Sequence, residues 1–251
     1  MFVLQPKIVI MNKSKVLVIL ALLLYILSVV FQFSDEDVIA NALKSIILPV
    51  VTLLYFVTVK RKSLFFTLFL VLFSISDLMI FIVPYISHDI DYFLGNSLYI
   101  LAYASLLVEV SKSISIVYVL RNYKIHLLVL TILNIYLIYV LQVIVDPFVS
   151  HQTNEYYIEL IYNIVMLLLL SVSLVNYFYR DNVKSLSMFI GALCIVFGEV
   201  IWVAYTYISE RNLLNAVSTT LYVLAFYFFY KQSKIEQEVE REEVNMLINN
   251  H

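Results

Sequence analysis

The chain has 251 residues, of which 63% are hydrophobic and only 14% are charged, and its mean hydropathy is +0.93. Soluble domains carry about 25% charged residues, so this composition excludes an ordinary soluble fold and indicates an integral membrane protein. The net charge is -2, and the sequence has no glycine-rich phosphate loop and no nucleic-acid motif. No nucleic-acid partner is therefore expected. The single cysteine, Cys194, excludes an intramolecular disulfide.

Eight apolar runs follow one another along the chain, most of them near the ~20 residues that a helix needs to cross a bilayer. They cover residues 16–33, 38–58, 64–84, 93–110, 125–145, 156–178, 186–207 and 212–230. We therefore expect an all-α polytopic membrane protein with eight transmembrane helices within residues 16–230. Residues 1–15 are expected to form a basic arm on the cytoplasmic side, and the Glu-rich residues 231–251 a polar helical tail on that side.

The positively charged residues sort to one side of an eight-span chain, and only Lys44 and Arg211 fall on the other side. By the positive-inside rule both termini then lie in the cytoplasm, and the expected location is the inner membrane of a bacterial cell. This sorting requires the 16–33 helix. It therefore argues against removal of that helix as a signal peptide, although Ala40-Asn41-Ala42 resembles a cleavage site.

Two carboxylates interrupt otherwise apolar spans at matching depths. Asp77 lies about seven residues before the outer end of the 64–84 span, and Glu199 about eight before that of the 186–207 span. Lys44 is about seven residues inside the 38–58 span, so all three charges are expected roughly 10 Å below the outer boundary. An unpaired charge near a helix centre costs about 2.5 to 3.5 kcal/mol. We therefore expect the three to meet in one layer, paired or open to water, and an intramembrane acid is a functional candidate by default.

Other polar side chains recur at helical spacing, which places them on one face of their spans. They are Asn41 and Ser45, then Asn96, Tyr99 and Tyr103, then Thr131, Asn134 and Gln142, then Glu159 and Asn163, and last Asn215, Ser218, Thr219 and Tyr222. Such residues either join helices to one another or line a cavity open to the outer leaflet. Segments 38–110 and 156–230 further suggest two parallel halves, an internal four-plus-four repeat with one acid in each half.

Short motifs mark four places along the spans. They are Lys44-Ser45, where Pro49 follows later, Ser76-Asp77-Leu78, Gly95 with Tyr99 and Ala102, and Gly191-Ala192 followed by Gly198-Glu199. Together with eight spans, these motifs resemble the YhhN family, eight-span membrane proteins that include the lysoplasmalogenases, over nearly the whole chain. The sequence departs from the family pattern at Glu199, where Asp is common, at Tyr103, where His is usual, and at Phe226, where Gln or His often stands.

The resemblance implies hydrolysis of the vinyl ether bond of a membrane lipid, lysoplasmalogen, to an aldehyde and a glycerophospho-alcohol, with no cofactor. This chemistry suits two carboxyl groups, one protonated to deliver a proton to the vinyl carbon and one ionised to activate water. In this interpretation Asp77, beside Lys44, is the base and Glu199 is the general acid, although the roles can be exchanged. The expected substrate or water ligands are Lys44, Tyr99, Tyr103, Asn163 and Tyr222.

Two other functions are open. A sensor could hold a lipid or small amphiphile in the same cavity and signal through the tail without catalysis, and Tyr103 in place of a histidine favours this alternative. A transporter or channel is expected to have broken spans, whereas Pro49 alone lies well inside a helix. No metal site is expected, because His88-Asp89-Ile90-Asp91 is interpreted as a solvated polar loop. The oligomeric state is not predicted.

Overall fold

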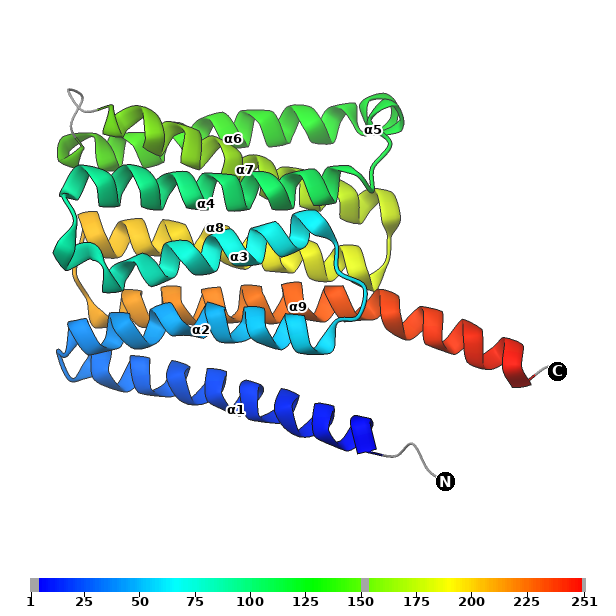
Figure 1. Cartoon of the computed structure of the whole chain (residues 1–251). Helices are drawn as coiled ribbons and strands as arrows, with labels where there is room; N and C mark the ends of the chain where they lie inside the picture. The colour runs from blue at the N-terminus through cyan, green and yellow to red at the C-terminus, as the bar shows by residue number, and fades with distance from the viewer. Residues whose placement is uncertain (1–4, 150–153, 250–251) are drawn as a thin grey trace.

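The computed structural model describes residues 5–149 and 154–249, and the side chains of residues 13–149 and 154–235. Over these residues the chain is helical without strands, and eight helices are long and apolar enough to cross a membrane, which confirms the predicted eight-span, all-α fold (Figure 1). They are α1 (Gln5–Phe33), α2 (Asp37–Thr58), α3 (Leu64–Leu78, whose span continues through a 3-10 turn to Phe81), α4 (His88–Ser111), α6 (Lys124–Val145), α7 (Glu155–Arg180), α8 (Val183–Tyr207) and α9 (Asn212–Asn249). The first four residues of the expected arm and the last two of the expected tail lie outside the described residues.

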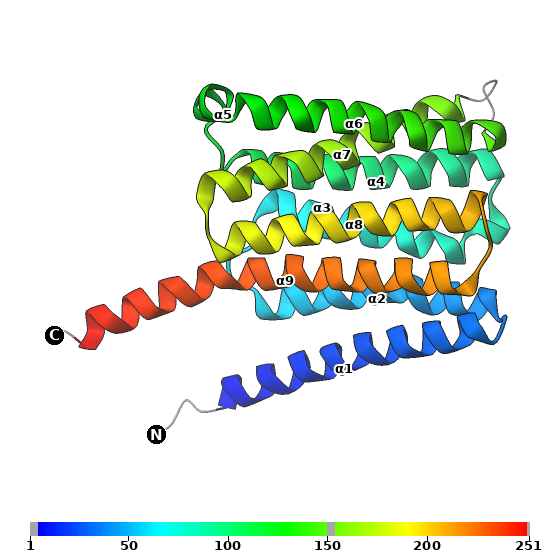
Figure 2. The same ribbon diagram turned by 180° about the vertical axis from the view of Figure 1, so that it is seen from behind.

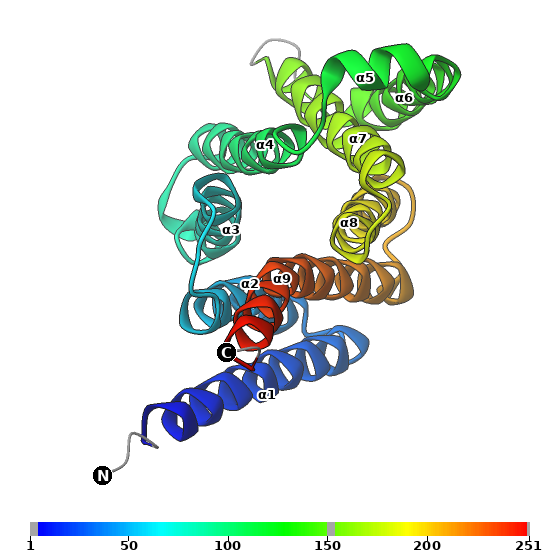
Figure 3. The same cartoon turned by 90° about the vertical axis from the view of Figure 1, so that its right-hand side faces the viewer.

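Six of the spanning helices form a ring when the bundle is viewed end-on (Figure 3). The order around the ring is α2, α3, α4, α7, α8 and α9. Helix α1 packs outside the ring against α2 and α9, and α6 packs outside it against α7. The start of α1 and the end of α9 lie at the same end of the bundle (Figures 1 and 2).

In each of the two expected halves, three consecutive helices follow one another around the ring. The outer helices are placed differently, because α1 packs against α2 and α9 whereas α6 packs against α7 and α8. The halves α2–α4 and α7–α9 therefore occupy opposite sides of the ring (Figure 3). This arrangement places α3 and α8, the helices that carry Asp77 and Glu199, across the ring from each other.

Aromatic side chains pack inside the ring of helices, toward the end of the bundle at which α1 begins and α9 ends. Phe69 and Phe229 are fully buried and meet edge to face with centroids 5.3 Å apart. Phe73 and Phe226 meet in the same way at 5.2 Å. Since lipid tails are as apolar as these side chains, close packing between helices stabilises this core.

The end of α3 and the start of α4 differ from the predicted boundaries. Helix α3 ends at Leu78, one residue after Asp77, and two 3-10 turns, η1 (Met79–Phe81) and η2 (Val83–Tyr85), follow where the 64–84 span was expected to continue. Pro84 lies in the second turn and cannot donate a backbone hydrogen bond. Helix α4 begins at His88, five residues earlier than expected, because the Ser87 side chain caps it by accepting a hydrogen bond from the Ile90 amide.

Four segments outside the predicted spans are also helical. A short helix, α5 (Ile116–Asn122), lies in the connection between α4 and α6, and a 3-10 turn, η3 (Asp146–Phe148), follows α6. Helix α1 already begins at Gln5. Helix α9 runs without interruption from the membrane-spanning part to Asn249, so the tail continues the last span (Figure 2).

Candidate functional site

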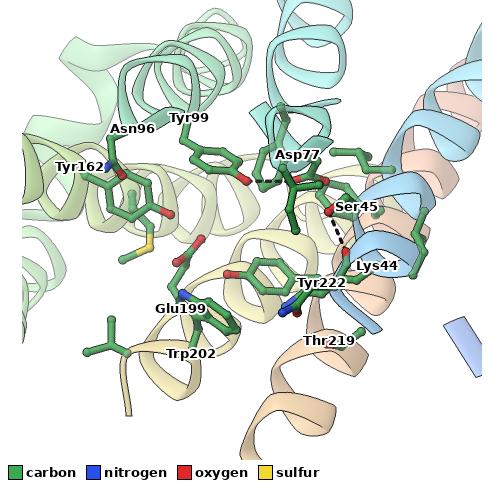
Figure 4. A pocket seen from close by; sticks show the side chains of 18 of the residues that line it. Lys44, Ser45, Asp77, Asn96, Tyr99, Tyr162, Glu199, Trp202, Thr219 and Tyr222 are labelled. Atoms are coloured by element: carbon green, nitrogen blue, oxygen red, sulfur yellow. Dashed lines mark hydrogen bonds between the residues drawn. The ribbon is translucent and has the colours of Figure 1, made fainter. Parts of the chain in front are cut away.

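A cavity of about 450 Å³ lies within the ring and receives side chains from all six ring helices. The two intramembrane acids, Asp77 and Glu199, both line it (Figure 4). Its other polar lining residues are Asn41, Lys44, Ser45, Asn96, Tyr99, Glu159, Tyr162, Asn163, Trp202, Tyr207, Thr219 and Tyr222. The remaining wall is apolar and includes Leu48, Phe73, Met166 and Phe226. The cavity therefore combines a charged centre with a hydrophobic wall.

The Asp77 carboxyl group is held by a tyrosine from the neighbouring helix. Tyr99 on α4 donates its hydroxyl to Asp77 Oδ1 at 2.7 Å (Figure 4). The Tyr99 ring is fixed in turn by an edge-to-face contact with Phe73, with centroids 4.7 Å apart. Asp77 lies in the last turn of α3, and the neighbouring Ser76 donates its hydroxyl to the Gly95 carbonyl at 3.0 Å, which ties this turn to α4.

The Glu199 carboxyl group faces three tyrosines. Tyr103 on α4 donates its hydroxyl to Glu199 Oε1 at 3.0 Å. Tyr162 and Tyr222 point their hydroxyls at the same carboxyl group from α7 and α9 (Figure 4). The Ser218 hydroxyl donates to the Gly198 carbonyl at 2.9 Å and joins α9 to α8 beside the acid. Glu199 is only 8% exposed, so these hydroxyls supply most of its polar surroundings.

Lys44 lies against aromatic rings at the same cavity. Its Nζ is 4.4 Å from the Trp202 ring centroid and 5.4 Å from that of Tyr222. In the part of the chain that the structure describes, Lys44 makes no salt bridge at 4.0 Å or less, although both Asp77 and Glu199 lie within electrostatic range. The three charges thus share one cavity without a direct ion pair, and the cation is stabilised by ring faces.

The five residues expected to bind substrate divide into two groups. Lys44, Tyr99, Asn163 and Tyr222 line the cavity. Tyr103 is fully buried and is not part of the lining, so its expected contact with a ligand stays a prediction. It donates its hydroxyl to the Glu199 carboxyl group from the protein side of that acid.

The polar residues that recur at helical spacing in the sequence also fall into two groups. Asn41, Ser45, Asn96, Glu159 and Thr219 line the cavity. Others join helices: Asn134 bonds Ser171 between α6 and α7, Asn215 bonds Gln32 between α9 and α1, and Gln142 donates to the Tyr156 carbonyl. Thr131 is exposed and donates to the Leu127 carbonyl of its own helix.

Tyr162, Trp202 and Tyr207 line the cavity but have no role in the sequence predictions. Tyr162 shares a helical face with Glu159 and Asn163, and Trp202 lies three residues after Glu199. The i, i+3 spacing to an acid is the sequence signal that could have identified both. Trp202 is also the only tryptophan of the chain, which makes it a natural reporter of the cavity.

One group of possible metal ligands occurs among the described residues, at the start of α4 and α7. His88, Asp89 and Glu155 can bring one ligand atom each within 4.8 Å of one another. His88 and Asp89 are exposed and lie 3.9 Å apart, but they belong to the first turn of α4 and not to a loop as predicted, and Glu155 is buried. The group includes none of the acids that line the cavity.

The geometry suits proton transfer to and from an amphiphile. Two carboxyl groups from different halves line one cavity, each has at least one tyrosine donor, and apolar wall continues beside them. No protein-family model, curated protein or solved structure matches the chain.

Proposed function

We propose that the chain is a YhhN-like intramembrane hydrolase that cleaves the vinyl ether bond of a lysoplasmalogen. The observation that supports this proposal is the placement of Asp77 and Glu199 on one cavity with an apolar wall. A lysolipid needs such a cavity because its reactive bond joins a polar headgroup to a hydrocarbon chain. Acid and base groups must then lie at the boundary between polar and apolar lining.

Each carboxyl group gives up one proton and accepts one proton over the whole reaction. Glu199 delivers a proton to the vinyl carbon remote from oxygen, and the oxocarbenium ion that forms is stabilised by the nearby carboxylates. Asp77 accepts a proton from water as the water oxygen bonds to the other vinyl carbon, giving a hemiacetal. In the second step Glu199 takes the hemiacetal hydroxyl proton and Asp77 returns its proton to the departing glycerol oxygen. The products are an aldehyde and a glycerophospho-alcohol, and both acids regain their starting states.

The tyrosines hold the carboxyl groups in place during these steps. The 2.7 Å bond from Tyr99 fixes the orientation of Asp77, and the 3.0 Å bond from Tyr103 fixes that of Glu199. Lys44 adds a positive charge within electrostatic range of both acids. Fixed donors of this kind cost no reorganisation at the moment of reaction.

We also propose that both termini lie in the cytoplasm of a bacterial inner membrane. Lys60, Arg61 and Lys62 connect α2 to α3, and Arg180 ends α7, at the same end of the bundle as the chain ends. The positive-inside rule assigns this end to the cytoplasm. The orientation can be tested with cysteines introduced into connecting loops at each end of the bundle and probed with a thiol reagent that does not cross the membrane.

The catalytic proposal is tested with purified, correctly inserted protein and a lysoplasmalogen, with aldehyde release as the signal. Asp77→Asn and Glu199→Gln are each expected to lower turnover by about 10²- to 10⁴-fold, the usual contribution of a general acid or base. Glu109→Gln is the matched control, because Glu109 also lies in a spanning helix but does not line the cavity. Wild-type rates in either acid variant contradict the mechanism.

A binding protein that senses an amphiphile is the second candidate. The observation that favours it is the continuity of α9, which carries Tyr222 and Phe226 on the cavity wall and runs on to Asn249. A ligand that displaces this wall could move the tail as a rigid extension. Ligand binding without turnover, across a panel of lysolipids, supports the sensor and contradicts the hydrolase.

A further inference from the structure

The connection between α4 and α6 forms a surface that neither the cavity nor the proposed reaction uses. Its helix α5 is seen end-on where the spanning helices are seen from the side (Figure 1), and from the side where they are seen end-on (Figure 3). Helix α5 therefore runs across the bundle axis, at the end where α1 begins and α9 ends. Because α6 begins its span directly after α5, this orientation places α5 parallel to the membrane plane, at the boundary between lipid and water.

The apolar side chains of α5 point mostly away from the protein. Val119 is only 6% exposed, whereas Ile116, Val117 and Leu120 are 66%, 78% and 57% exposed. A helix of seven residues is too short to be stable in water by itself, and one buried valine gives it little packing against the bundle. The acyl chains of a lipid leaflet provide the apolar environment that the other three side chains lack in the protein.

Tyrosines hold α5 at the level of the membrane interface. The ring of Tyr118 packs against the rings of Tyr123 and Tyr179, with centroids 6.3 Å and 5.4 Å apart. Tyr123 also donates its hydroxyl to the Phe178 carbonyl at 3.0 Å, which joins the segment after α5 to the end of α7. Tyrosine is enriched where hydrocarbon meets the lipid headgroups, so this cluster is typical of that level.

Two cations stand beside the apolar surface. Arg121 in the last turn of α5 and Lys124 at the start of α6 are both exposed. Within the part of the chain that the structure describes, neither makes a salt bridge at 4.0 Å or less. Residues 110–145 contain no Asp or Glu, and Arg180 is followed by Asp181, so that neighbouring pair adds little net charge. Two exposed cations next to apolar side chains complement a negatively charged lipid surface.

We infer that α5 and the start of α6 form an interfacial binding surface for an anionic phospholipid. Ile116, Val117 and Leu120 lie among the acyl chains, while Arg121 and Lys124 bind the phosphate and the net negative charge of the headgroup. A zwitterionic phospholipid carries the same phosphate, but its ammonium group is repelled by the two cations, so it binds less well. The occupant is a lipid and not a soluble protein, because the cations and the apolar side chains adjoin at the end of a membrane span. This surface is independent of the proposed reaction.

Brominated lipids test the surface, because bromine atoms on an acyl chain quench a tryptophan that they contact. The probe protein is the full chain with Trp202→Phe, which removes the only tryptophan, and Val117→Trp, which introduces one at the most exposed apolar position of α5. It is reconstituted into mixed vesicles of dioleoylphosphatidylglycerol and dioleoylphosphatidylcholine, with each lipid brominated in turn. The two quenching curves give the relative binding constant. It is expected to favour phosphatidylglycerol at least about tenfold, since each Lys or Arg near an anionic surface adds about fivefold.

Charge-neutralising substitutions in the probe protein locate the selectivity. Arg121→Gln with Lys124→Gln is expected to bring the relative binding constant to within about twofold of one. Both positions are exposed, so the fold does not depend on them. Lys231→Gln with Lys234→Gln is the matched control, because it removes two lysines from the last turn of the α9 span, and it leaves the relative binding constant unchanged.

The outcomes separate the lipid surface from its alternatives. A preference for phosphatidylglycerol that is lost in the Arg121→Gln, Lys124→Gln protein and kept in the control supports the inference. Equal binding of the two lipids by the probe protein overturns it, and so does a preference that both double variants keep. Absence of quenching by either brominated lipid also overturns it, because α5 then faces water, as a docking surface for a soluble protein would.

Discussion

Gly191→Ala tests the close packing of α8 against α9 that sets the position of Glu199. A Cβ atom at Gly191 would lie 2.5 and 2.6 Å from two ring carbons of Phe229, well inside the ~3.5 to 4.0 Å of a favourable carbon contact. Phe229 is fully buried and packs edge to face on Phe69 at 5.3 Å. The ring cannot turn aside without moving a second ring, so the helices must separate.

The expected loss of stability follows from two opposing contributions. Overpacking of this kind costs typically about 1 to 3 kcal/mol, and two ring carbons at such short distances favour the upper end of that range, about 3 kcal/mol. Alanine in a helix gains about 1 kcal/mol over glycine, which leaves a net loss of about 2 kcal/mol. For a chain of this size, that loss lowers the melting temperature by roughly 4 to 8 °C.

The assay is thermal unfolding in one detergent, followed by fluorescence-detected size-exclusion chromatography. Gly95→Ala is the matched control, because the nearest atom to its Cβ would be Ser76 Oγ at 4.0 Å, and its melting temperature is expected to be unchanged or slightly higher. A Gly191→Ala protein as stable as the Gly95→Ala protein would refute the assignment of a tight contact at this position.

Three further substitutions have defined expectations. Tyr103→Phe removes the hydroxyl that bonds Glu199 and is expected to cost about 0.6 to 1.7 kcal/mol, measured in a double-mutant cycle with Glu199→Ala, which removes the acceptor; a zero coupling energy contradicts the bond. Gln32→Ala removes the amide that joins α1 to α2 and α9 and is expected to cost about 1 to 3 kcal/mol in thermal unfolding, so an unchanged melting temperature argues against this network. Leu106→Ala, at a fully buried site, is expected to cost about 2 to 5 kcal/mol, whereas Ile132→Ala, at a site 61% exposed, changes stability by less than about 0.5 kcal/mol; equal effects would mean that α6 faces protein instead of lipid.

The eight spans could be predicted because a bilayer imposes a length and an apolar composition on each of them. Hydropathy predicts the ends of the helices less well, because these ends depend on local hydrogen bonds. The early start of α4 has a signal in Ser87 followed by Asp89 and Asp91, a cap with acids in the first helical turn. The early end of α3 has a weaker sequence signal, Pro84, which disfavours helical geometry in the residue before it.

The acids of the cavity were visible in the sequence because charges inside a span are rare and costly. Tyr99, Tyr103 and Tyr222 were expected near a substrate, but the acid that each tyrosine contacts could not be predicted, because the chain has 20 tyrosines and five of the eight spans contain two or more. Which of them reaches an acid depends on the order of helices around the ring, and the contact of Tyr103 with Glu199 joins residues 96 positions apart. Helical spacing says which face a residue shares, but not which helix that face meets.

In the proposed reaction, Asp77 and Glu199 have different parts although they stand on corresponding helices of the two halves of the ring. Equivalent positions in the two halves place Asp77 and Glu199 on α3 and α8, which face each other across the ring (Figure 3). Lys44 stands seven residues after the start of α2, and Tyr162 stands seven residues after the start of α7. One half therefore brings an ammonium to the cavity where the other brings a phenol. An acid and base pair works only if its members hold protons differently. In the proposed reaction this departure from symmetry is one source of the difference, and the unequal tyrosine contacts of Asp77 and Glu199 are another.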